Sequence, residues 1–347
     1  MKNSFLLRFL KNWTLPVAIT VGVSVYLLFA LTPRLAPAGD VLGPVFERLL
    51  PATIFATLFV TFSKVDYHRM RPCRWHACIL AAQLLLIALI VAAILGAHHL
   101  PFPILHSSSY KLLLEVILIC VIAPCASASP VVTAKLGGDI TQMTTFVLIS
   151  STIASLLIPA VFPVIEPHAG STFTAAFLTI LKRLTAVLLL PLVLGAIVRH
   201  WVLPLHRWFL RTPDLGFYLW CVSLSITAGL TMRNILLTLN HQPSSLFVAI
   251  ALLALITALV QFAIGRIIGR ATGEHICTGQ AMFQKNTGLA IWIAFVYLTP
   301  EASIGAGCYV LWQNLINSYE LWQHRHSGAS SPDTAATPTA AQKSTHP

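Results

Sequence analysis

The chain has 347 residues, of which 56% are hydrophobic and 10% are charged, and its formal net charge is +11. Soluble domains carry about 25% charged residues, so this composition excludes an ordinary soluble domain and indicates an integral membrane protein. A net positive charge can point to nucleic acid, but the basic residues here gather in alternate short loops, which is typical of membrane orientation signals. We therefore expect the chain to contact a lipid bilayer and not to bind nucleic acid.

Ten segments are apolar and approach or exceed the roughly 20 residues that are needed to cross a bilayer. In chain order they are residues 13–32, 42–63, 76–97, 110–136, 140–165, 174–199, 215–233, 246–269, 275–299 and 303–321. No small-residue cleavage site follows the first segment, so we expect it to be retained, with residues 1–12 as a cytoplasmic tail. Residues 324–347 are rich in Ser, Ala, Thr and Pro, which predicts a disordered cytoplasmic tail. The predicted fold class is all-α integral membrane.

The distribution of Lys and Arg predicts the orientation of these spans. In a ten-span chain the two tails and the more basic loops fall on one side, and those loops hold Lys64, Arg69, Arg71, Arg74, Lys135, Arg199, Arg207, Arg211, Arg266 and Arg270. The opposite loops hold only Arg34, Lys111 and Arg233. The positive-inside rule therefore predicts a multi-pass protein of the plasma (inner) membrane with both termini in the cytoplasm.

The two halves of the chain, residues 13–165 and 174–321, each contain five of these segments. An odd number of spans forces the second half into the opposite orientation, so we expect two inverted five-helix repeats. The fourth segment of each half is interrupted, by Pro124-Cys125-Ala126-Ser127-Ala128-Ser129-Pro130 in the first and by Gln284-Lys285-Asn286-Thr287-Gly288 in the second. Interrupted segments at matching places in two halves are typical of a transporter's binding site.

The interrupted segments bring polar groups to bilayer depth. Breaking a helix there frees backbone groups, which is tolerated only where they line a cavity or are buried in protein. An ammonium at the depth of Lys285 is costly and indicates a functional residue. Gln83 is a lone amide that serves either as a ligand or as a hydrogen-bond link between helices. The candidate binding residues are thus Gln83, Ser127, Ser129, Gln284, Lys285, Asn286 and Thr287.

These residues carry a resemblance to a known family. The order of spans, the Pro-x-x-x-Ala-Ser segment from Pro124, the run Asn286-Thr287-Gly288-Leu289-Ala290, Gln83 and Trp312-Gln313-Asn314 resemble the bile acid:sodium symporter family over about residues 10–322. The chain is identified as a divergent member, within the bile/arsenite/riboflavin transporter superfamily. The resemblance implies ten helices in a panel domain and a core domain, with broken helices four and nine crossing in the core. It also implies transport of organic anions, usually by sodium symport, and it adds Asn314 to the candidate binding residues.

The chain departs from the family's pattern at the sodium ligands. The positions of an amide, two hydroxyls and the shared carboxylate fall here on Pro130, Met143, Val147 and Ala281, and a glutamine position is Lys285. Only Gln83 and Ser129 match, so we expect degenerate sodium sites, and no metal or cofactor. The ammonium of Lys285 then takes the place of the cation, and because a buried lysine can load and release a proton, the carrier would be proton-coupled or uncoupled.

The expected function is a secondary active transporter of a small organic anion, bile-acid-like or another carboxylate or sulfonate, that works by alternating access. One alternative is a sodium-coupled symporter of the same family despite the lost ligands. Another is an arsenite or metalloid efflux permease, because Ala123-Pro124-Cys125 resembles the cysteine segment of the arsenite-efflux permeases of the same superfamily, which implies that the Cys125 thiolate binds the cargo. An enzyme is not expected, because no span carries a paired acidic or metal-ligand motif. Two charged residues have structural predictions: Asp139 as a helix cap and Glu47 as a partner of another helix.

Overall fold

The computed structural model describes residues 14–96, 107–167, 172–212, 214–239 and 243–326. The regular secondary structure of these residues is helical, which confirms the all-α fold class, and helices lie on each of the ten apolar segments. The tail expected at residues 1–12, and all but the first residues of the tail expected at 324–347, lie outside the described residues.

Six helical stretches in the described part are long and apolar enough to cross a membrane. They are α3 (Ala36–Lys64), α4 (Arg74–Gly96), α7 (Ile140–Ile165), the continuous stretch Phe173–Trp201, α11 (Leu215–Leu239) and α12 (Ser244–Thr272). The stretch Phe173–Trp201 comprises α8 (Phe173–Leu184), the π-helical turn η4 (Thr185–Leu189) and α9 (Leu190–Trp201). These helices indicate a multi-pass membrane protein.

The other helices are shorter, or interrupted, or more polar. They are α2 (Thr14–Leu31), η1 (Tyr67–Arg69), α5 (Ser108–Ile122), α6 (Ser129–Lys135), α10 (Leu203–Arg211), α13 (His275–Phe283), α14 (Thr287–Tyr297) and α15 (Pro300–His326). The two predicted interruptions appear as the unwound links between α5 and α6 and between α13 and α14.

Polar side chains and proline fix where several helices begin. The carboxylate of Asp139 accepts hydrogen bonds from the backbone N–H groups of Thr141 (2.7 Å) and Gln142 (3.0 Å), which confirms its prediction as a cap. Asn286 caps α14 in the same way, since its Oδ1 accepts from Leu289 N at 3.2 Å. Pro130 lies in the first turn of α6, where its missing N–H costs no helical hydrogen bond.

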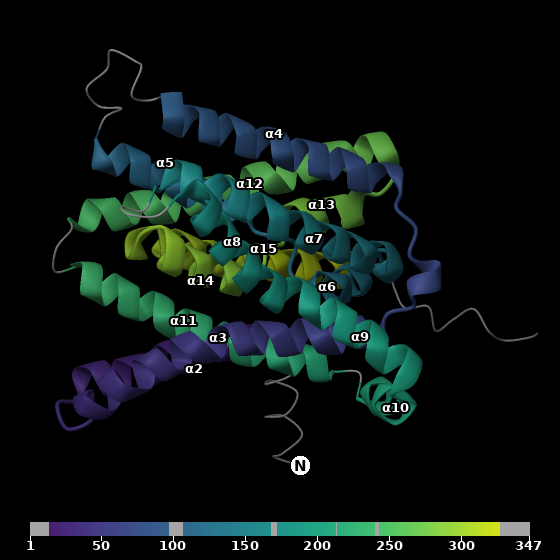
Figure 1. Cartoon of the computed structure of the whole chain (residues 1–347), viewed down its shortest axis with the longest axis horizontal. Helices are drawn as coiled ribbons and strands as arrows, with labels where there is room; N and C mark the ends of the chain where they lie inside the picture. The colour runs from purple at the N-terminus through teal and green to yellow at the C-terminus, as the bar shows by residue number, and fades with distance from the viewer. Residues whose placement is uncertain (1–13, 97–106, 168–171, 213, 240–242, 327–347) are drawn as a thin grey trace, which may run out of the picture.

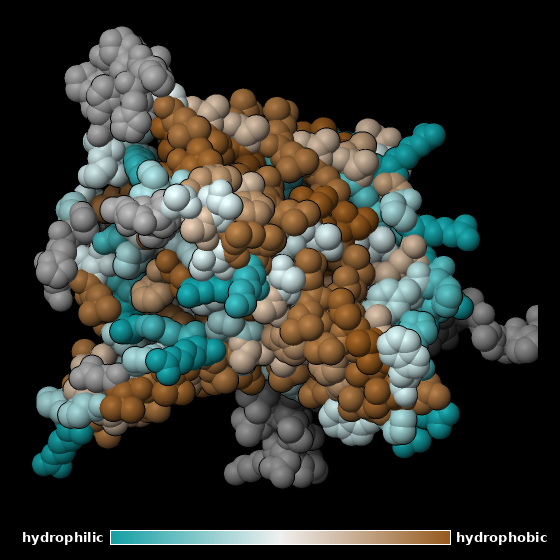
Figure 2. Space-filling model, viewed as in Figure 1, coloured by the Kyte–Doolittle hydropathy of each residue, from teal (hydrophilic) through white to brown (hydrophobic). Residues whose placement is uncertain are grey.

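The helices form two groups (Figure 1). The panel layer consists of α2, α3, α9, α10 and α11, in which α2 and α3 pack on α11, and α9 packs on α3. The core layer contains α4, α5, α6, α7, α12, α13, α14 and α15, with α12 against α13 and α15 against α5. Most of the helices run along the long axis, and the space-filling view shows hydrophobic residues in the middle of this axis with hydrophilic residues toward both ends (Figure 2).

Candidate functional site

The two unwound links meet each other inside the core layer. They run antiparallel, with Cys125 opposite Lys285. The N–H of Ala126 donates to the carbonyl of Gln284 (3.0 Å), and the N–H of Asn286 donates to the carbonyl of Pro124 (2.8 Å). Each break therefore satisfies backbone groups that the other break has freed, which is how irregular backbone is tolerated in a membrane protein.

Side chains from three further helices hold this crossing in place. Gln83 of α4 donates through Nε2 to the carbonyls of Val121 (2.8 Å) and Ala123 (3.4 Å) at the end of α5. Ser150 of α7 accepts from the N–H of Cys125 (3.1 Å), and Gln313 of α15 accepts from the N–H of Lys285 (2.8 Å). The amide of Gln83 thus links helices, and the breaks are supported from α4, α7 and α15.

Lys285 is enclosed by protein without a counter-charge. Only 1% of the residue is exposed, and its Nζ has no hydrogen-bond partner among the described residues. The titratable groups that act on it electrostatically are the thiols of Cys125 and Cys120, and no carboxylate is among them in the described part of the chain. An unpaired ammonium in such a place costs several kcal/mol of stability. The fold therefore retains Lys285 at a cost.

The positions where a sodium cage would be expected are apolar. Met143, Val147 and Ala281 are fully buried in the main hydrophobic cluster of the core layer, and Pro130 is buried beside Ser129. The hydroxyl of Ser129 already accepts from the thiol of Cys125, at 3.2 Å. Hard cations are bound by oxygen ligands. The side chains of Met143, Val147, Ala281 and Pro130 contain no oxygen. The residues present do not fit a sodium site at these positions.

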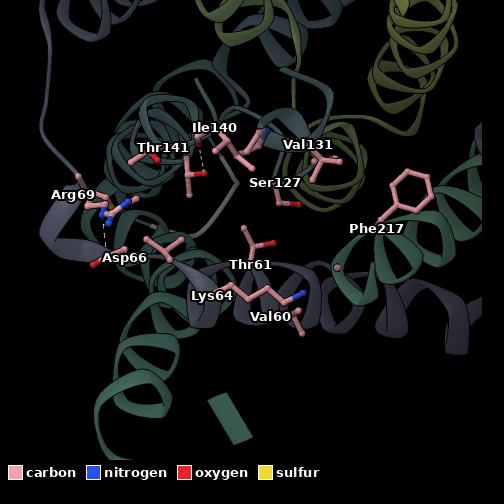
Figure 3. A pocket seen from close by; sticks show the side chains of 16 residues that line it. Val60, Thr61, Lys64, Asp66, Arg69, Ser127, Val131, Ile140, Thr141 and Phe217 are labelled. Carbon is pink, nitrogen blue, oxygen red and sulfur yellow. Dashed lines mark hydrogen bonds and ion pairs between the residues drawn. The ribbon is translucent and has the colours of Figure 1, made fainter. Parts of the chain in front are cut away.

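A crevice of about 370 Å³ opens between the two layers (Figure 3). Its panel wall includes Thr61 and Lys64 of α3, and its core wall includes Ser127, Thr141 and Thr144. Thr61, Ser127 and Thr141 point toward the hollow from opposite sides (Figure 3). The hydroxyls of Thr61 and Thr144 donate to the carbonyls of Thr57 and Ile140 in their own helices. The hydroxyls of Ser127 and Thr141 can donate hydrogen bonds to an anion.

Charged groups surround the mouth of this crevice. Asp66 pairs with Arg69 (3.5 Å) and with Arg199 (3.1 Å), and Lys64 donates through Nζ to the carbonyl of Thr212 (2.8 Å). Burial raises the pKa of Tyr67 to about 12, so its phenol stays protonated and donates to the carbonyl of Phe62. These contacts tie the link between α3 and α4 to the ends of α9 and α10.

A second, small cavity of about 20 Å³ lies beside the two breaks. It is lined by residues of α11 and by Ala126, Ser127, Asn286, Thr287 and Gly288. Ser127 borders both cavities, so the small cavity lies next to the crevice, and it reaches the first turn of α14. Gly288 permits this approach, because a Cβ there would lie 3.3 Å from Ser223 Oγ of α11. Neither set of lining residues includes Lys285.

A family model matches this architecture. The model of the SBF-like CPA transporter family (DUF4137) matches residues 13–315, which include both interrupted helices. The chain belongs to the SBF-like CPA transporter family. This confirms the resemblance to the bile acid:sodium symporter family and makes a transporter the general activity that the chain supports. No curated protein matches the chain in sequence.

The structure of this SBF-like chain divides the predicted site residues into two sets. Ser127, Asn286 and Thr287 reach the cavities between the layers. The others are buried. Of these, Asn314 does not contact the crossing through its NH₂ group, which donates to the carbonyl of Val310 in its own helix (2.7 Å). It is the neighbouring Gln313 that contacts the break. The remaining buried residues are Gln83, Ser129, Gln284 and Lys285.

Cys125, the proposed metalloid ligand of the alternative function, is only 2% exposed and lines neither cavity. Its thiol donates to Ser129.

The predicted partner of Glu47 on another helix is confirmed as Arg233 of α11. Sequence reasoning missed Thr61, Thr141 and Thr144 in the SBF-like crevice. Threonines in apolar helices usually bond their own backbone, as Thr144 does to Ile140, so their spacing carried no signal.

Proposed function

We propose that the chain is a secondary carrier that moves a small organic anion across the plasma membrane by alternating access. The observation that carries the proposal is the meeting of two interrupted helices beside a crevice that separates two helical layers. The first turn of α14 borders the small cavity, and the positive end of the dipole of a helix favours anions at its N-terminus. The hydroxyls of Ser127 and Thr141 add neutral donors.

We further propose ten crossings arranged as two inverted repeats, residues 13–165 and 174–321, with both termini cytoplasmic. Support comes from the position of each break, which interrupts the fourth apolar segment of its half, and from the antiparallel pairing of the two breaks. The crevice mouth carries Lys64, Arg69 and Arg199, which belong to the side that the positive-inside rule assigns to the cytoplasm. The crevice is then open to the cytoplasm.

The coupling mode that we propose replaces sodium by Lys285, so that transport is proton-coupled or uncoupled. Ala281 removes the carboxylate that the family resemblance places there, and Lys285, four residues later, brings a cation into the same crossing. The loss of one negative charge and the gain of one positive charge together change the charge of the crossing as much as two bound sodium ions would. A lysine shielded from water can also exchange a proton during the cycle.

Uptake into proteoliposomes tests this proposal. A panel of labelled carboxylates and sulfonates should identify a transported anion, and the variant Lys285→Gln should change both the rate of uptake and its dependence on pH. The matched control is Lys182→Gln, which alters an exposed lysine of α8 away from the breaks. The same rate and pH profile in Lys285→Gln as in the unaltered protein would contradict the role of the ammonium, and no transport of any anion would contradict the carrier function.

A further inference from the structure

A second large cavity lies in the panel layer, at the end away from the crevice. It has a volume of about 610 Å³ and lies between α2, α3 and α11. Its walls on α3 and α11 include residues 36–49 and 222–237, whereas the crevice reaches residues 60–64 of α3 and 216–217 of α11. We call this cavity the panel groove.

The panel groove is open to the surroundings of the protein. Its apolar wall residues Val25, Leu49, Val222 and Leu237 are 40–54% exposed. The helices α2 and α3 each pack closely on α11 but make few contacts with each other, so α11 is the floor of the groove. In a membrane-spanning chain such apolar walls contact hydrocarbon, and an acyl chain fits their surface.

One cation lies among these apolar walls. The guanidinium of Arg233 pairs with Glu47, and its side chain remains 29% exposed. It lies over α3, because a Cβ added to Gly43 would be 3.7 Å from Arg233 Cζ. A guanidinium carries five N–H donors, and Glu47 is its hydrogen-bond partner among the described residues. Donors are therefore left for a second anion, and phosphate matches their planar geometry.

The depth of Arg233 suits a lipid headgroup. Arg233 precedes the end of α11 by six residues, which corresponds to about 9 Å along the helix. Long basic side chains near helix ends extend toward the membrane interface, where lipid phosphates lie. Of the described residues that line the groove, Arg233 is the only charged one, and its partner Glu47 is not among them. The excess of positive charge favours an anionic over a zwitterionic lipid.

We propose that the panel groove binds one anionic glycerophospholipid of the leaflet opposite the crevice mouth. Its phosphate contacts Arg233, and an acyl chain lies between α2 and α3 on α11. The inference does not depend on the transported substrate or on the role of Lys285. It assigns to the panel layer a lipid that fixes the splayed helices α2 and α3 relative to α11.

Binding of phosphatidylglycerol to the purified full chain tests the proposal, with phosphatidylcholine as the control lipid. Native mass spectrometry in detergent measures the bound lipid, and thermal unfolding measures the stabilisation it brings. We expect preferential binding of phosphatidylglycerol to the unaltered protein. In Arg233→Gln we expect binding to weaken by at least about tenfold, equal to about 1.4 kcal/mol.

The matched control is Glu47→Gln, which removes the other half of the same pair. It frees the guanidinium, so phosphatidylglycerol should bind at least as tightly as to the unaltered protein. If Arg233→Gln does not fold, the double variant Glu47→Gln/Arg233→Gln leaves neither charge unpaired and should also lose the preference. An equal preference in the arginine variants would overturn the proposal. So would a homodimer that closes the groove, seen as a doubled mass that excludes lipid.

Discussion

Lys285 places an ammonium group at the crossing of the two breaks. Its backbone N–H has a hydrogen-bond partner, whereas its ammonium has none among the described residues. The partner of the N–H is the side chain of Gln313. The sequence alone could identify this lysine, because a charge in the middle of an apolar span stands out. It could not identify Gln313 rather than the neighbouring Asn314, because both carry an amide and the direction of each side chain depends on how α15 packs.

Replacing Lys285 by an apolar residue should stabilise the protein while impairing transport. Lys285→Met removes an unpaired buried charge, and we expect it to raise the free energy of unfolding by at least about 1 kcal/mol. Thermal unfolding in detergent measures this change. Lys135→Met is the matched control: it alters a lysine at the end of α6 that lies over the Phe217 ring, and it should give no gain. A lower melting temperature for Lys285→Met than for the unaltered protein would show that the ammonium has a stabilising partner.

We expect the side chain of Gln83 to stabilise the folded protein. Gln83→Leu leaves the carbonyls of Val121 and Ala123 without their donor at the broken end of α5. We expect a loss of about 1–3 kcal/mol, the cost of unsatisfied buried polar groups. Gln83→Glu is a stringent comparison, because it keeps the shape but replaces the donating NH₂ by an oxygen, and it should be destabilised as well. Full stability of both variants would mean that Gln83 does not support the break.

The broken helices show which local features of the chain could be predicted. Pro124 and Pro130 in one segment, and the polar run from Gln284 to Gly288 in the other, mark the interruptions because they remove donors or add polar groups at bilayer depth. The antiparallel pairing of the two breaks follows from long-range packing and was not visible in either segment. Likewise, the supports Ser150 and Gln313 come from α7 and α15, whose sequences contain other buried Ser, Gln and Asn residues.

Filling the space at Gly288 should impair transport without unfolding the protein. A Cβ at Gly288 would lie 3.3 Å from Ser223 Oγ and 3.4 Å from Thr227 Oγ1, so Gly288→Val would close the small cavity beside α14. We expect uptake of the transported anion to fall at least about tenfold, because a closed cavity blocks access to the α14 N-terminus. The control is Gly96→Val at the end of α4, where no atom of the described residues outside its own helix backbone lies within 4 Å of an added Cβ. Normal uptake by folded Gly288→Val would place the anion elsewhere.

The whole molecule combines features that the sequence predicts with features that it does not. The ten apolar segments follow from the order of residues in the sequence, and helices lie on all ten. The side of the membrane on which the basic loops lie stays a prediction. The division into panel and core layers came only as an implication of the family resemblance, because it depends on which apolar faces pack together. The crevice between the layers is lined by threonines that the sequence did not distinguish from others.

Cross-linking the layers should stop transport if they move relative to each other. Thr61→Cys and Thr141→Cys place thiols on opposite walls of the crevice (Figure 3), in a background where Cys73, Cys78 and Cys308 are serine. A bismaleimide that joins the two thiols should abolish uptake. The control pair, Thr61→Cys and Gly216→Cys, joins two residues within the panel layer and should leave uptake intact. Uptake that survives the first cross-link would exclude rigid movement of the two layers.

The most direct test of the central claim is the uptake of a transported anion into proteoliposomes with an inward sodium gradient and without sodium. Met143, Val147 and Ala281 offer no oxygen ligand, and Lys285 supplies a cation at the crossing. We therefore expect the same initial rate and the same final level of anion with and without sodium. Accumulation of the anion above its external concentration that requires the sodium gradient would contradict this account.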